Sequence, residues 1–261
     1  MKYNALPDNI FSFMAAEDEN AHVSTYKNVQ HLHALEKVDS IVRSPVPKLH
    51  VPKEMSSVAR LYLFIHYQLY STFANLMRLH LAEAMAAQRK AIDAALSAYK
   101  IVDDPATVNN YENREWEFQN IKTHIVKVRK GDPAKYPLAD ELIKTHEVAS
   151  EYGAHADVST FVLRTANEPI EGSADQMRQL FLYFQAPESE AQCNLMYVDA
   201  LSNFLTITRI FDPFFKQYTK DWDVEGWINH RDAHDGWIRK ELGRVHGELE
   251  KEFNAEKGKS A

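Results

Sequence analysis

The feature that most constrains this fold is the stretch Lys53–Asp104, which contains neither proline nor glycine. Apolar residues recur along it at helical spacing from Leu61 to Ile101, and Pro105 then prevents the helix from continuing. One continuous helix of this length would measure roughly 70 Å at 1.5 Å per residue, which exceeds a compact domain. We therefore expect either one long, bent helix here or two helices in tandem.

The rest of the chain predicts a mainly α-helical bundle with a small β-hairpin. Apolar periodicity places further helices over about 25–42, 106–130, 137–152, 187–218 and 224–254. Two segments rich in β-branched and aromatic residues, 159–165 and 179–184, flank a turn-rich stretch that contains Pro169 and Gly172. This pattern is typical of a hairpin, which we expect near 159–184 as the only sheet.

The positions of the prolines and the changes in apolar pattern divide the chain into three parts. Residues 1–54 are interrupted by prolines and predict an irregular N-terminal segment with one short helix. Residues 55–254 predict a single helical domain, and residues 255–261 a disordered tail. The chain has only 8 glycines in 261 residues, which disfavours many-stranded sandwiches and glycine-rich phosphate loops.

Charge and cysteine content bear on partners and compartment. The formal net charge of −7 disfavours nucleic acid as a partner, because the phosphate backbone would be repelled. The single cysteine, Cys193, lies among apolar neighbours, which favours a core side chain and does not require an oxidising compartment. No apolar run is long enough to span a membrane or to form a signal peptide. We expect a soluble cytoplasmic protein, and an unburied apolar face on the long helical stretch favours a homodimer.

Three polar residues far apart in the chain form the main candidate site. Arg89 and Asp93 share a helix face at positions i and i+4, and Gly153 fits a left-handed helix cap that would turn His155 toward the bundle. A buried guanidinium, carboxylate and imidazole would form a preorganised polar cluster. The alternative is an ordinary ion pair on a helix surface that only fixes helix register.

The residues around this trio extend the candidate site. Arg114 is a further catalytic candidate, while Tyr111, Tyr152 and Asp157 are candidate binding residues. The function that we expect is the binding of a small ligand or a protein partner in a polar cleft between the long helix and the hairpin. No motif assigns a reaction or a cofactor, so we predict no cofactor.

Two arginine–histidine pairs favour a different function. Arg60 with His66, and Arg239 with His246, resemble in spacing the motif of the HEPN toxins, a superfamily of helical RNases. The resemblance implies a cation that stabilises a developing oxyanion and a histidine that moves a proton. The residues after Arg60 are apolar, where that motif has a polar neighbour. The alternative function is therefore a defence-type nuclease or hydrolase that uses such a pair, or His155 with an arginine.

His230 and His234 form a candidate metal pair. Positions i and i+4 share a helix face, as metal ligands often do. Arg231 occupies the place at which zinc hydrolases of the HEXXH type carry a glutamate. The alternative is that the two histidines form the polar edge of the apolar helix face, beside Trp227 and Trp237. We predict no metal site.

Overall fold

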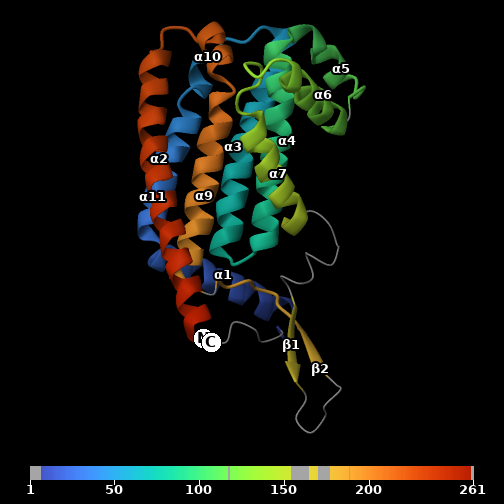
Figure 1. Cartoon of the computed structure of the whole chain (residues 1–261). Coiled ribbons are helices and arrows are strands. Elements are labelled where there is room, and N and C mark those ends of the chain that lie inside the picture. The colour runs from blue at the N-terminus through green and yellow to red at the C-terminus, as the bar shows by residue number, and fades with distance from the viewer. Residues whose placement is uncertain (1–6, 117, 154–164, 170–176, 188, 260–261) are drawn as a thin grey trace.

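A computed structural model of the chain describes residues 7–116, 118–153, 165–169, 177–187 and 189–259. In these ranges the fold is mainly α-helical, which confirms the predicted fold class at that level (Figure 1). The α-helices are α1 (Ile10–Lys27), α2 (Val29–Arg43), α3 (Ser56–Met77), α4 (Leu81–Asp103), α5 (Val108–Glu112), α6 (Phe118–Gly131), α7 (Ala139–Gly153), α9 (Glu190–Arg209), α10 (Asp212–Tyr218) and α11 (Val224–Lys259). Short 3-10 helices, η1 (Val46–Lys48), η2 (Lys53–Met55) and η3 (Pro105–Thr107), lie in the connections.

The stretch without proline or glycine is two helices, α3 and α4, that pack against each other side by side (Figure 1). The prediction of one long helix is therefore wrong, and that of two in tandem holds. The chain reverses at Leu79, whose φ of 64° is left-handed. The amides of Leu79 and His80 donate to Leu76 and Asn75, closing a Schellman motif without its usual glycine. Folding back lets the two apolar stripes bury each other.

The N-terminal segment is more regular than predicted. Helix α1 occupies residues that the sequence assigned to irregular structure, and α2 corresponds to the predicted short helix. Asn9 and Ser12 form a capping box that starts α1. Phe11 remains 78% exposed, so α1 lacks the clean apolar face by which a pattern search recognises a helix.

The core lies between α3, α4 and α9. Helix α9 is buried on nearly every face, with α2 and α11 packed against it and α7 packed against α4. The hydroxyl of Tyr62 on α3 donates to the Val42 carbonyl at 2.7 Å, and the indole of Trp227 on α11 donates to the Ile41 carbonyl at 2.9 Å. These bonds tie α2 into the same core. Among the described residues, no helix is both long enough and apolar enough to cross a membrane.

Helix boundaries elsewhere differ from prediction in three places. The helix expected over 187–218 is divided into α9 and α10. The predicted helix over 106–130 is divided into η3, α5 and α6, and the turn after α5 is described below. The last helix, α11, continues to Lys259 and so includes residues assigned to a disordered tail. Pro213 lies in the first turn of α10, where its fixed φ is compatible with a helix start.

Strands β1 (Thr165–Pro169) and β2 (Met177–Phe181) pair antiparallel, with Thr165 opposite Phe181. β1 covers residues that the sequence assigned to the turn, while the predicted first strand lies outside the described residues apart from Thr165. The strands project from the end of the bundle near α1, whereas α5 and α6 lie at the other end (Figure 1).

Candidate functional site

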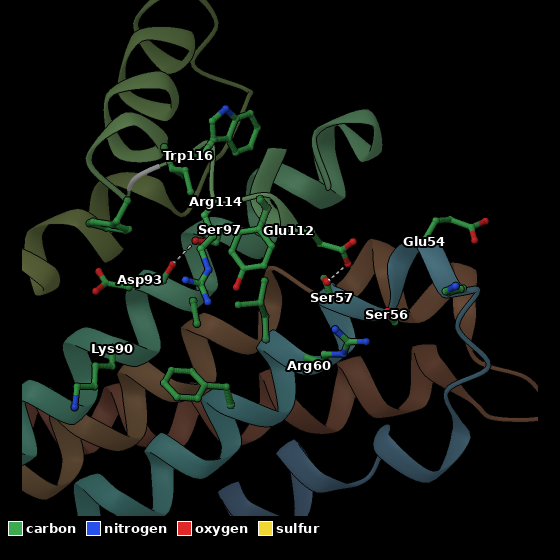
Figure 2. Close-up of a pocket in the computed structure, with 17 residues that line it drawn as sticks. Glu54, Ser56, Ser57, Arg60, Lys90, Asp93, Ser97, Glu112, Arg114 and Trp116 are labelled. Carbon is green, nitrogen blue, oxygen red and sulfur yellow. Dashed lines mark hydrogen bonds between the residues drawn. The ribbon is translucent and has the colours of Figure 1, made fainter. Parts of the chain in front are cut away.

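A groove of about 1270 Å³ is formed by the first turns of α3, the middle of α4, α5 and the start of α6. Figure 2 shows its polar side chains, which come from both the bundle and the α5–α6 segment. The groove is therefore at the end of the bundle away from the hairpin (Figure 1). This differs from the predicted cleft between the long helix and the hairpin, because α3 and α4 are separate helices and the α5–α6 segment covers their other end.

One hydrogen bond holds the short helix α5 to the start of α3. The Ser57 hydroxyl donates to Oε1 of Glu112 across the groove (Figure 2). Ser57 itself is buried, whereas Glu112 is exposed. Helix α3 has neither a side-chain cap nor an acidic residue in its first turn. The positive end of its dipole is therefore not neutralised by the helix's own side chains.

On the α4 side of the groove, the carboxylate of Asp93 lies against a buried imidazole, that of His146. Nε2 of His146 on α7 lies 2.9 Å from Oδ1 of Asp93, and the two side chains are 8% and 31% exposed. Phe118 stacks on the imidazole at 4.9 Å between ring centroids. Sequence reasoning missed His146. Its spacing from Leu142 and Ala149, both buried, could have indicated a polar residue on the buried face of α7.

The surroundings of His146 do not form a Ser-His-Asp triad. The hydroxyl of Ser150 lies 3.4 Å from Nδ1 of His146, but it donates to the His146 carbonyl at 2.6 Å. Such a bond to the preceding helical turn is an ordinary way to satisfy a helical serine. Ser150 also does not line the groove. We assign the Asp93–His146 pair the role of fixing α7 against α4 beside the groove.

Arg114 adopts an unusual backbone conformation at the end of α5. Its φ is 59°, and its amide donates to the Tyr111 carbonyl while the amide of Glu115 donates to Asn110. These two bonds are a Schellman motif with Arg114 at the position where glycine is favoured. A left-handed residue other than glycine costs roughly 1–2 kcal/mol. The conformation turns the chain after α5, and Figure 2 shows the Arg114 side chain extending into the groove.

The charges of the groove are unevenly compensated. Its cations are Lys53, Arg60, Lys90 and Arg114. None of them forms a hydrogen bond or ion pair with any part of the chain that the structure describes. Its carboxylates are Glu54, Asp93 and Glu112. Asp93 is paired with His146 and Glu112 accepts from the neutral Ser57, whereas Glu54 forms no ion pair with the described chain. Figure 2 shows Arg60 and Arg114 extending into the groove from α3 and from the turn after α5, with Lys90 directed away from both.

Aromatic side chains form much of the remaining wall. Lys100 lies over the ring of Trp116, with Nζ 5.7 Å from the centroid, and Phe118 is covered by His146. Within the described ranges, the rings of Phe64 and Tyr111 stack on no other ring or cation. Burial raises the pKa of the Tyr111 hydroxyl, so this group remains a hydrogen-bond donor at neutral pH.

The structure brings together some of the predicted site residues and separates others. Asp93, Tyr111 and Arg114 line the groove. Arg89 lies one helical turn before Asp93 but does not line it, and its Nε has no hydrogen-bond partner among the described residues. His155, Asp157 and the side chain of Tyr152 lie outside the described residues. The imidazole beside Asp93 is that of His146.

The two arginine–histidine pairs are not brought together as pairs. Arg60 lines the groove, whereas Nε2 of His66 is bonded to Asp39 on α2 at 2.7 Å. The other arginine, Arg239, binds Asp235, Glu141 and Thr206 through its guanidinium. The arrangement that the HEPN-like spacing implies is therefore not formed by either pair, because the side chains point to different neighbours.

The candidate metal pair has no third ligand within the described part of the chain. Among the residues that the structure describes, no group of three histidine, cysteine or acidic side chains is placed to hold a metal ion. His230 is exposed, while His234 stacks on Trp237 with ring centroids 5.7 Å apart. Burial, together with the nearby charge of Lys37, lowers the pKa of His234. Cys193 is half-buried against the core, and burial raises the pKa of its thiol.

A second, smaller hollow of about 470 Å³ lies between α1, the start of α4 and the residues around the end of β2. Asn9, His80 and Glu83 are among its polar lining residues. Nε2 of His80 is 2.8 Å from Oε1 of Glu17, which does not line the hollow. The ring of His80 also packs against Phe184 and Phe13. These contacts give the His80 side chain its partners within the protein. The hollow is therefore a weaker candidate for a ligand site than the groove.

No protein-family model, no curated protein and no solved structure matches this chain. The function must therefore be argued from the groove itself.

Proposed function

We propose that the protein binds a small anionic ligand in the groove between α3, α4 and the α5–α6 segment. The observation that carries the proposal is that Lys53, Arg60, Lys90 and Arg114 line one groove and form no ion pair with the described part of the chain. The same lining holds three carboxylates, so the cations exceed the anions by one. The protein as a whole is acidic, with a net charge of −7. A groove whose lining holds four cations and three carboxylates is therefore locally positive on a protein that is acidic overall.

The geometry of the groove favours a small ligand over a protein partner. Its volume of about 1270 Å³ is concave space, somewhat above the ~300–1,000 Å³ range of most ligand pockets. Arginine pairs with carboxylates and phosphates through two parallel hydrogen bonds, so Arg60 and Arg114 supply directional anion recognition. The half-buried aromatic wall lowers the local dielectric constant and strengthens such contacts.

The proposal is tested by binding measurements with a multivalent anion. Isothermal titration calorimetry with tripolyphosphate should show one site on the full chain, and binding should weaken as salt is raised. Replacing Arg60 by Gln should raise the dissociation constant about tenfold, since a hydrogen bond to a charged group contributes ~1.5–3 kcal/mol.

The matched control is Lys240→Gln, which removes one positive charge from an exposed position on α11 outside the groove. It changes the net charge by the same amount as Arg60→Gln and should leave binding unchanged. Equal weakening by both variants would show a general charge effect and would overturn the proposal, as would the absence of any binding.

Other predictions from the sequence remain predictions. A nuclease or hydrolase that uses His155 requires a residue outside the described ranges. A cytoplasmic location agrees with the single free cysteine. A homodimer is supported by four exposed apolar or aromatic residues along α3, which are Leu63, Phe64, Tyr67 and Tyr70. Sedimentation of the purified chain would establish its oligomeric state.

A further inference from the structure

The backbone conformation of Arg114 does not itself require an arginine side chain. The Schellman motif after α5 needs only a left-handed residue, and glycine adopts that conformation most easily. The exposed Arg114 side chain makes no hydrogen bond or ion pair within the described chain. The guanidinium of Arg114 therefore lies in the groove without a partner in the described chain and can contact a ligand there.

A second arginine faces the same space from a different element. Arg60 lies in the second turn of α3, and its side chain is also unpaired among the residues described. Figure 2 shows the two guanidinium groups on either side of the middle of the groove. Two separated guanidinium groups can bind successive phosphates of one chain more readily than the single charge of a monoanion.

The aromatic wall supplies a different kind of contact. Phe64 is 41% exposed and Tyr111 is half-buried, and neither ring is stacked on another within the described residues. The neighbouring rings of Trp116 and Phe118 are already covered by Lys100 and His146. Phe64 and Tyr111 therefore remain available to stack on a flat, uncharged group.

From this juxtaposition we infer that the anionic ligand is a nucleoside di- or triphosphate. Its phosphates bind Arg60 and Arg114, and its base stacks on the free aromatic wall. This inference rests on the proposed function and names the class of ligand for the same groove. The net charge of −7 opposes a long polynucleotide, which would be repelled along its length. A mononucleotide contacts only the groove, where Arg60 and Arg114 have no ion-pair partner in the described chain.

The test compares three probes on the full chain at one ionic strength: ATP, tripolyphosphate and adenosine. ATP should bind about tenfold more tightly than tripolyphosphate, and adenosine should bind most weakly, because only ATP uses both kinds of contact. Phe64→Leu, which keeps an apolar side chain but removes the flat ring, should weaken ATP binding by about tenfold and leave tripolyphosphate binding unchanged.

Arg114→Gly separates binding from folding. Glycine suits the left-handed backbone, so the melting temperature should be unchanged or higher, while ATP and tripolyphosphate should each bind about tenfold more weakly. Leu79→Gly is the matched control, since it makes the same change at the other Schellman motif, outside the groove. It should leave binding unchanged. If Arg114→Gly lowers the melting temperature, Arg60→Gln provides the same test from α3.

The outcomes distinguish the two proposals. Equal affinities for ATP and tripolyphosphate would overturn the nucleotide inference and leave the anion-binding function standing. A failure of both probes to bind would overturn both. A short single-stranded oligonucleotide that binds more tightly than ATP would also overturn the inference, because the ligand would then be a nucleic acid.

Discussion

Two clusters of arginines in this protein differ in how their charges are compensated. In the first, between α9, α10 and α11, Arg231 is only 1% exposed, yet both of its terminal nitrogens bind the carboxylate of Asp212. Asp235, equally buried, accepts from Arg209 at 2.7 Å and from Arg239 at 2.9 Å. The indole of Trp227 lies 5.1 Å from the Arg231 guanidinium. Here each arginine has an acidic partner supplied by the fold.

The groove is the opposite case. Arg60 and Arg114 are exposed, and the described chain gives neither of them an acidic partner. Burying a charge is costly unless it is paired, so the first cluster can exist only because folding completes it. An exposed charge is solvated by water, so it can remain unpaired in the absence of a ligand. The contrast supports a structural role for the first cluster and agrees with the binding role that we propose for the second.

The largest effect that would test this contrast is expected in the first cluster. Asp212→Ala leaves Arg231 buried without its main partner, and it should lower the free energy of unfolding by about 3–5 kcal/mol. Urea denaturation of the variant and the wild type measures the difference. A loss below ~1 kcal/mol would show that Asp232, whose Oδ1 lies 3.0 Å from Arg231, or solvent compensates the charge equally well.

An intermediate effect on stability is expected for Asp39 and His66, a partly buried pair that lies outside both clusters. Burial alone would raise the pKa of Asp39, but hydrogen bonds from Tyr70 and His66 outweigh it and lower the pKa below its usual value. A carboxyl with a lowered folded-state pKa stabilises the protein above its unfolded pKa, and this contribution is lost as the pH falls through the folded value. Asp39→Asn should therefore reduce the stability difference between neutral pH and strongly acidic pH, by less than ~1 kcal/mol.

Urea denaturation across the acidic range measures this difference. The control is Asp18→Asn, at an exposed position of α1. It should leave the pH dependence of stability as it is in the wild type. A change of equal size in both variants would show that the titration of Asp39 reflects overall charge and not its local hydrogen bonds.

The smallest effect on stability is expected in the groove. Arg60→Gln removes an exposed side chain that contacts no acidic partner in the described chain, so the free energy of unfolding should change by less than ~0.5 kcal/mol. The same urea titration measures it. A large loss of stability would mean that Arg60 belongs to the structural class, and the contrast between the two clusters would fail.

Prediction from sequence succeeded where the signal is local. Apolar spacing located most of the helices, although the single helix expected over 187–218 is divided into α9 and α10. It failed for α1, which is poorly amphipathic, and at Leu79, where the chain turns without a glycine. It placed Asp93, Tyr111 and Arg114 in a candidate site, and all three line one groove. It did not identify His146, because the contact between α4 and α7 joins residues far apart in the chain.

The sequence by itself determined that this chain is mainly helical, because the period of its apolar residues is a property of neighbours along the chain. Tertiary structure alone decided which charges are satisfied. Arg231 and Arg60 are the same residue type on helical segments, and no local pattern distinguishes them. Only the packing of α10 against α11, which brings Asp212 to Arg231, leaves one arginine paired and the other free to bind.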